Sequence, residues 1–95
     1  MKRILVVCGT LDYFHSWGNT LLEWYNITAD ERTRNILEVS TAEGSARYIA
    51  YTPCMDKDSL RGCRFNKIID LVGLSDKDKA FFDSLVEGED ESKIT

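Results

Sequence analysis

Hydrophobic residues near the start of the chain form one uninterrupted run. Positions 4–8 read Ile-Leu-Val-Val-Cys, between Lys2-Arg3 and Gly9-Thr10. A short, β-branched run of this kind is typical of a parallel strand that helices cover on both faces. The run therefore predicts a central, buried strand with a sharp exit at the glycine.

The next hydrophobic positions change to a helical period. They predict a helix over 11–25, capped by Thr10 or Asp12, with an apolar stripe that packs on the first strand. Within that helix, Gly18 is expected to admit a neighbouring backbone. The stripe comprises five residues: Phe14, Trp17, Leu21, Trp24 and Tyr25.

Polar and hydrophobic positions alternate through the middle of the chain. Two runs with this period of two surround Gly44-Ser45, and they predict a β-hairpin over 36–51. Ahead of the hairpin, Thr28 and Glu31 have the spacing of a capping box. That spacing predicts a short helical turn.

Hydrophobic positions in the last third predict a second core strand and a final helix. After a polar loop over 52–62 the strand covers 65–72, and its part 67–72 should lie parallel and adjacent to the first strand. Ser75 is placed to cap a helix over 76–86. Together the elements predict an α/β fold: a small layered domain with parallel central strands, a β-hairpin extension and helices on the sheet.

Composition indicates one α/β domain over 1–87, followed by an acidic tail over 88–95. The chain has 95 residues, of which 43% are hydrophobic, enough for one packed core. We expect the tail to be mobile, because little in it can be buried. The formal net charge of −4 disfavours duplex DNA as the main partner.

Cysteine usage indicates a reducing compartment. Cys8, Cys54 and Cys63 are odd in number and fit no metal-ligand spacing. No run approaches the roughly 18 apolar residues of a membrane span, and no signal peptide is evident. We therefore expect a cytoplasmic chain with no cofactor, no metal and no membrane partner.

One pair of residues near the first strand has the types needed for nucleophilic catalysis. Cys8 ends that strand and His15 follows in the helix, so a thiol and a base could lie close together. Nothing in the sequence orients the base. A partly exposed helical histidine is the favoured interpretation, and we assign no catalytic residue.

A second arrangement could bind an anion. The Gly9-Thr10 turn follows a strand as phosphate-binding turns do, and Arg61 and Arg64 supply positive charge. These four residues are the candidate anion site. The alternative is structural, because any strand-to-helix turn needs such a glycine.

The segment 44–70 runs as a strand, a polar loop, the turn Leu60-Arg61-Gly62 and a strand that ends on Asp70. This order resembles the part of phage terminase and helicase-type P-loop ATPases that leads into their acidic, magnesium-binding strand. The resemblance spans roughly 3–72. Residues 4–10 stand where those enzymes have the strand that follows the phosphate loop and its helix.

Two departures from that family concern its chemistry. The phosphate-binding loop G-x-x-x-x-G-K-[ST] does not occur in the sequence, and Leu71 stands where the family has a second acid. The resemblance therefore implies a degenerate fragment of an ATPase core, encoded by a bacteriophage and lacking ATP hydrolysis. Asp70 is expected to cap nearby backbone N–H groups instead of holding magnesium.

A chain of this size without a polar cluster for catalysis is expected to act through another macromolecule. We expect a non-enzymatic, phage-type accessory or inhibitor protein that binds and modulates a host or viral protein in the host cytoplasm. The alternative is a binding module for a phosphorylated small molecule, a nucleotide or a nucleic acid. That module would use the candidate anion site.

Loop 52–64 is the expected contact surface for a protein partner, because loops carry recognition more often than the elements that hold them. The acidic tail would speed the encounter with a basic partner. The exposed side of helix 11–25 is the alternative surface. The predicted contact residues are Met55, Asp56, Asp58, Arg61 and Arg64.

Overall fold

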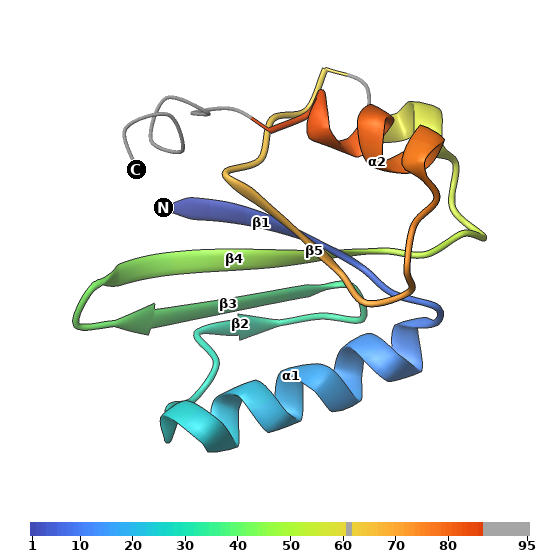
Figure 1. The fold of residues 1–95 in the computed structure, drawn as a ribbon. Helices are drawn as coiled ribbons and strands as arrows, with labels where there is room; N and C mark the ends of the chain where they lie inside the picture. The colour runs from blue at the N-terminus through green and yellow to red at the C-terminus, as the bar shows by residue number, and fades with distance from the viewer. Residues whose placement is uncertain (61, 87–95) are drawn as a thin grey trace.

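Within the part of the chain that the structure describes, five strands form one sheet with a helix on each side (Figure 1). The computed structural model describes residues 1–60 and 62–86. The acidic tail and Arg61 lie outside this part. In chain order the elements are β1 (Lys2–Val7), α1 (Leu11–Tyr25), β2 (Glu31–Arg32), β3 (Ile36–Thr41), β4 (Gly44–Tyr51), the 3₁₀ helix η1 (Lys57–Leu60), β5 (Lys67–Asp70) and α2 (Asp76–Asp83).

The sheet is mixed, with the order β2-β3-β4-β1-β5. β1 pairs in parallel with β4 on one side and with β5 on the other, and Ile4 lies opposite Lys67. The predicted α/β fold, with two adjacent parallel strands, is confirmed. However, β5 is an edge strand of the described sheet and ends at Asp70, two residues earlier than predicted.

β1 is buried on both faces, as its hydrophobic run predicted. Ile4, Val6 and Cys8 belong to the core on the α1 side of the sheet. Leu5 and Val7 belong to the core on the α2 side, together with residues such as Phe82. Because successive side chains of a strand alternate between faces, an uninterrupted apolar run was needed to supply both cores.

α1 has the predicted bounds and is capped by Thr10, whose side chain accepts a hydrogen bond of 3.0 Å from the N–H of Tyr13. The predicted apolar stripe is wrong at its end, because Trp24 is 80% exposed and Tyr25 is 59% exposed. Trp24 lies about 100° around the helix from the middle of the buried pair Phe14 and Gly18, so its side chain points away from the core. Leu22 and Ile27, on either side of these two aromatic residues, still pack against the core.

Gly18 does allow a close approach, but of side chains and not of a backbone. A Cβ at this position would lie 3.2 Å from Leu37 Cδ2 and 3.3 Å from Arg32 Nη2. The same Nη2 donates a hydrogen bond of 2.8 Å to the carbonyl oxygen of His15. This side of α1 therefore packs against β2 and β3.

The predicted hairpin is confirmed as β3 and β4, which pair antiparallel across a link at 42–43. Glu38 and Arg47 lie directly opposite each other and form an ion pair. The short helical turn predicted from Thr28 and Glu31 is wrong. Glu31 begins the strand β2 instead, because its backbone pairs with the free side of β3.

The second half of the chain contains two short helical segments. The loop predicted over 52–62 includes η1, and α2 ends at Asp83, three residues earlier than predicted. Ser75 caps α2 as expected, because its hydroxyl oxygen accepts a hydrogen bond of 3.3 Å from the N–H of Asp78. After α2 the chain runs back beside the segment that precedes β5. There the carbonyl oxygen of Leu85 accepts a hydrogen bond of 2.9 Å from the N–H of Phe65.

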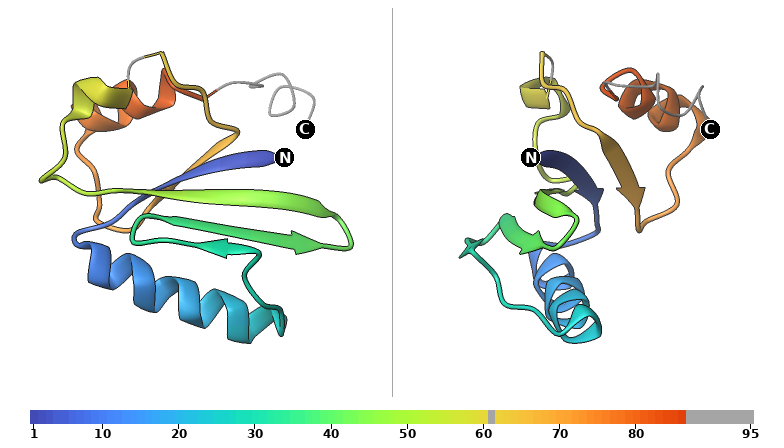
Figure 2. Two further views of the ribbon diagram at one scale, coloured as in Figure 1. Left: turned by 180° about the vertical axis from the view of Figure 1, so that it is seen from behind. Right: turned by 90° about the vertical axis from the view of Figure 1, so that its left-hand side faces the viewer.

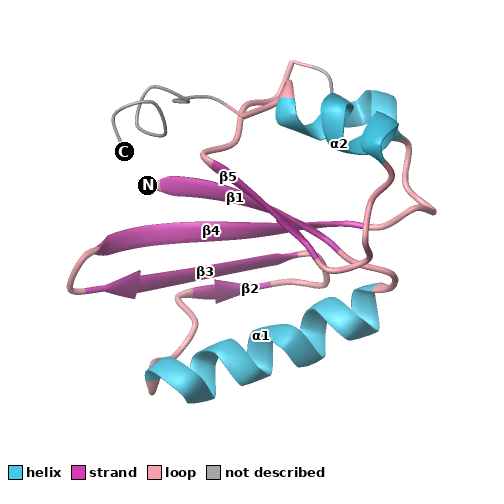
Figure 3. Ribbon diagram, in the orientation of Figure 1, coloured by secondary structure: helices cyan, strands magenta, loops and turns pink. Residues whose placement is uncertain are grey.

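The two helices cover opposite faces of the sheet, and each leaves part of its face open. The right-hand view of Figure 2 looks along the strands and shows α1 on one side, with α2 and η1 on the other. Figure 3 shows that β5 has no described helix beneath it on the α1 side. None of the described helices is long and apolar enough to cross a membrane.

Candidate functional site

The carboxyl ends of β4, β1 and β5 lie at one edge of the sheet, where open parallel α/β sheets usually bind ligands. The predicted Gly9-Thr10 turn lies here. The Thr10 hydroxyl already serves as the acceptor that begins α1. A ligand at this turn would therefore compete with the helix cap, which favours the structural interpretation of the turn.

The carboxylate of Asp70 accepts hydrogen bonds from the backbone of the loop that follows it. One carboxylate oxygen accepts bonds of 3.0 and 2.9 Å from the N–H groups of Val72 and Gly73, and the other accepts one of 2.8 Å from Leu74. The bond from Leu74, followed by the other two, holds the pKa of Asp70 below its usual value. Asp70 therefore caps nearby N–H groups, as the sequence predicted.

Cys8 and His15 do not form a reactive pair in the described structure. Cys8 is fully buried, its thiol lies 3.7 Å from the carbonyl oxygen of Tyr51, and burial raises its pKa. His15 is exposed on α1, and no hydrogen bond joins it to the thiol among the described residues. A protonated, buried thiol is a core group and a poor nucleophile.

The residues of the candidate anion site are not brought together. Gly9 and Thr10 follow the carboxyl end of β1, whereas Arg64 precedes the amino end of β5. Parallel strands of this length separate those positions by roughly 20 Å. Arg64 is exposed, and its guanidinium donates a bond of 3.1 Å to the carbonyl oxygen of Cys63. Arg61 lies outside the described residues.

The predicted contact loop is held mainly by bonds within itself. The carboxylate of Asp56 accepts a bond of 2.9 Å from the N–H of Asp58 at the start of η1. The Tyr51 hydroxyl donates to the carbonyl oxygen of Met55 at 3.2 Å, and the Met55 side chain is half-buried. These bonds give Met55 and Asp56 structural roles, while contact with a partner remains a prediction.

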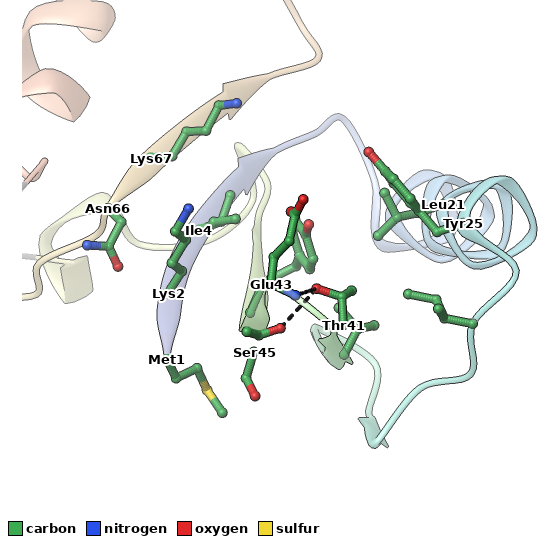
Figure 4. A pocket seen from close by; sticks show the side chains of 15 residues that line it. Met1, Lys2, Ile4, Leu21, Tyr25, Thr41, Glu43, Ser45, Asn66 and Lys67 are labelled. Carbon is green, nitrogen blue, oxygen red and sulfur yellow. Dashed lines mark hydrogen bonds between the residues drawn. The ribbon is translucent and has the colours of Figure 1, made fainter. Parts of the chain in front are cut away.

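A groove lies at the opposite edge, where β1, β4 and β5 begin. Figure 4 shows this groove, of about 1020 Å³, between the last turns of α1 and the amino ends of the strands. Leu21 and Tyr25 form the helix side of the groove. Its other apolar lining residues are Met1, Ile4, Ile27, Val39, Ala46 and Tyr48.

Two lysines lie on the strand side of the groove. Lys2 and Lys67 belong to the neighbouring strands β1 and β5, and both project from the face that α1 covers (Figure 4). Both are exposed, and neither takes part in an ion pair among the described residues. Glu43, at the link of the hairpin, is an acidic lining residue. The groove therefore has an apolar stretch along α1, and at the amino ends of the strands it has two lysines and one glutamate beside neutral polar residues such as Ser45.

Two tyrosines supply hydroxyl groups to the groove. Burial, and secondarily the charge of Tyr25, raises the pKa of Tyr48. The Tyr48 ring has an edge-on contact with Trp17, with ring centroids 5.3 Å apart. Near neutral pH the Tyr48 phenol offers a hydrogen bond without charge.

Exposed aromatic residues extend the apolar surface along α1. At 100° per residue, Tyr13, Trp17, Leu21 and Trp24 fall within about 80° on one side of the helix, which we call the aromatic flank. Tyr13 is 51% exposed and Trp24 is 80% exposed. Since the other side of α1 packs on β2, the aromatic flank lies on the side of the helix away from β2, where Trp17 contacts Tyr48 of β4.

The aromatic flank was missed at the level of sequence, because Trp17, Leu21 and Trp24 were assigned to the buried stripe, which did not include Tyr13. One signal was available. The buried positions Phe14 and Gly18 are four residues apart, whereas Trp17 and Trp24 lie about 80–100° from the middle of that pair. The positions with the largest side chains were therefore displaced from the axis of the buried face.

Two further possibilities among the described residues are a metal site and a second pocket. No group of three or more His, Cys, Asp or Glu side chains is placed to hold a metal ion in the part of the chain that the structure describes. A smaller pocket of about 340 Å³ lies beneath α2, and it is lined mainly by apolar groups such as Val7, Met55 and Phe82. The groove remains the better candidate.

Comparison with protein-family models, with curated proteins and with solved structures gives no match for this chain. The resemblance of 44–70 to a phage P-loop ATPase core therefore stays a prediction. Functional inference depends on the geometry of the groove and of the aromatic flank.

Proposed function

We propose that the chain is a non-enzymatic accessory protein that binds and modulates a protein partner. The observation that supports this proposal is the aromatic flank beside the groove. Side chains of Trp and Tyr are the residues most often found at the centres of protein interfaces, because they bury large areas at a small entropy cost. Trp24 is 80% exposed, so most of its apolar surface is not buried in the isolated chain.

The state of the polar groups at the carboxyl edge supports the non-enzymatic part of the proposal. Thr10 and Asp70 both accept backbone hydrogen bonds that hold local structure. Catalysis there would require the same groups to bind substrate. The phage setting, and a role as an inhibitor, rest only on the resemblance of 44–70 to terminase and helicase-type ATPases.

Affinity capture with paired variants tests the proposal. The parent chain, Trp24→Ser and His15→Ala are immobilised separately, and captured proteins are quantified by mass spectrometry. Both side chains are exposed on α1, but His15 lies on the opposite side of the helix from the aromatic flank. We expect a protein that the parent chain and His15→Ala retain and that Trp24→Ser loses.

Capture profiles that are the same for all three chains would argue against a protein-binding role for the aromatic flank. The alternative, a module for nucleotides or nucleic acids, predicts a different result. A thermal-shift screen with nucleotides and oligonucleotides would then raise the melting temperature by several degrees. Titration with Mg-ATP is expected to show no binding tighter than millimolar, and micromolar binding that Asp70→Ala abolishes would overturn the expectation.

A further inference from the structure

We infer that the groove and the aromatic flank bind an amphipathic helix of the partner, with acidic residues at the end that meets Lys2 and Lys67. The inference rests on the proposed protein-binding function and names the chemistry of the partner. Three observations carry it: the room on this face of the sheet, the apolar surface that borders the room, and the charge at one end.

The room follows from the width of the sheet. Five strands at a spacing of 4.8 Å span about 19 Å, whereas a helix with its side chains is about 10 Å across. α1 is the one described helix on its face, and it lies over the central strand β4. The part of this face in front of β5 has no described helix over it (Figure 3).

The border of this room is apolar on both sides. Ile69 and Leu71, at the β5 edge, pack against the α1-side core but stay partly exposed. Leu21 and Tyr25 line the opposite side, on α1. A helix placed between them could insert side chains spaced at i, i+3, i+4 and i+7, which is the usual mode of helix-in-groove recognition.

Charge gives the helix its direction and its composition. Lys2 and Lys67 lie at the end of the groove where β1 and β5 begin, and no ion pair neutralises either of them among the described residues. Bringing an apolar helix over these ammonium groups would cost solvation unless carboxylates paired with them. Acidic residues at one end of the helix satisfy this condition.

A peptide library provides the probe. Random peptides of about 16 residues, roughly the length of α1, are displayed and selected on the immobilised chain. We expect the enriched sequences to have a helical apolar period with Asp or Glu clustered near one end. Synthetic copies should gain helicity on binding, as measured by circular dichroism.

Paired variants locate the binding and test the charge. Lys67→Glu and Lys2→Glu should each weaken a selected peptide roughly tenfold, about 1.4 kcal/mol. Lys77→Glu makes the same charge change on α2, and it should leave the affinity unchanged. A peptide whose clustered acids are replaced by Lys should bind Lys67→Glu better than it binds the parent chain. Trp24→Ser should also weaken binding, while His15→Ala should not.

Several results would overturn the inference. Enriched peptides without a helical period, enriched peptides that are basic, or binding that Lys67→Glu leaves unchanged would each do so. A parent chain that elutes as a dimer, with a Trp24→Ser variant that elutes as a monomer, would make a second copy the occupant. A selected peptide that binds only after deletion of residues 88–95 would make the chain's own acidic tail the occupant.

The failure of this inference can be told apart from the failure of the proposed function. If Trp24→Ser loses a captured protein but the selected peptides lack acidic helices, the protein-binding function stands and the partner's chemistry is wrong. If no captured protein depends on Trp24 and no peptide is enriched, both are wrong.

Discussion

The two ends of the parallel strands hold their polar groups in opposite states. At the carboxyl end, Thr10 and Asp70 are bound to backbone N–H groups and Cys8 is buried. At the amino end, Lys2 and Lys67 have no ion pair among the described residues, and they border the groove. The end that usually binds ligands in open α/β sheets therefore uses these groups for folding here. The opposite end borders the groove in which we propose that a partner binds.

Thiol labelling should show the largest difference between exposed and enclosed groups. Cys54 is exposed and should react at the rate of a free thiol, whereas Cys8 should react at least about a hundredfold more slowly. The buried thiol is reached only when the protein opens, and burial also raises its pKa. Mass spectrometry of labelled peptides measures both rates, and denaturant should equalise them. Equal rates in the native protein would mean that the carboxyl end is open.

Replacing Asp70 tests whether its carboxylate has a structural role. Asp70→Ala should lower the free energy of unfolding by about 1–2 kcal/mol, because three backbone N–H groups lose a charged acceptor at an exposed position. Denaturant titration at pH 7 measures the loss. A variant as stable as the parent chain would leave Asp70 free for another role.

The same carboxylate predicts a pH dependence with a defined sign. The pKa of Asp70 is lowered in the folded protein, so its contribution is present above the unfolded value of about 3.9. The contribution is lost as the pH falls through the lower, folded value. The difference in stability between the parent chain and Asp70→Ala should therefore vanish in strong acid. A difference that persists there would indicate a cause other than the charge.

Removing the cap of α1 should have a smaller effect. Thr10→Ala should cost about 1 kcal/mol, because the N–H of Tyr13 loses its acceptor. Thr10→Ser keeps the hydroxyl and serves as the matched control, with stability close to that of the parent chain. If both variants lose stability equally, the methyl group of Thr10, and not the hydrogen bond, is responsible.

Substitutions at the amino end should have the smallest effect on stability. Trp24→Ser and Lys67→Glu should each change the free energy of unfolding by less than about 0.5 kcal/mol, because both side chains are exposed. The same variants should lose partner binding. A destabilisation above about 1 kcal/mol would instead give these residues a role in folding, and the contrast between the two ends would disappear.

Local patterns determined much of the fold. The run at 4–8 predicted a strand buried on both faces, and the cores on the α1 and α2 sides both use it. Thr10 and Ser75 predicted two helix starts correctly, since a cap depends on residues within one turn. The hairpin 36–51 was equally local, because alternation and a short link specify its pairing.

Only the tertiary structure decided where those elements end and what they leave exposed. Glu31 became a strand because β3 offered it a free edge, although its spacing from Thr28 resembled a helix start. Trp24 became exposed because α1 meets the core around Phe14 and Gly18, which leaves Trp24 to one side of the contact. Asp70 ended β5 by capping the loop that follows it.

The sequence by itself determined the types of the longer elements, the buried central strand and the structural roles of Thr10 and Asp70. It did not determine the groove, whose lining includes Lys2, Leu21, Tyr25, Ala46 and Lys67 from four separate elements. Their proximity depends on strand order and on the side of the sheet to which α1 packs. These are long-range choices, set by the sum of many small packing terms, so no short stretch of sequence encodes them.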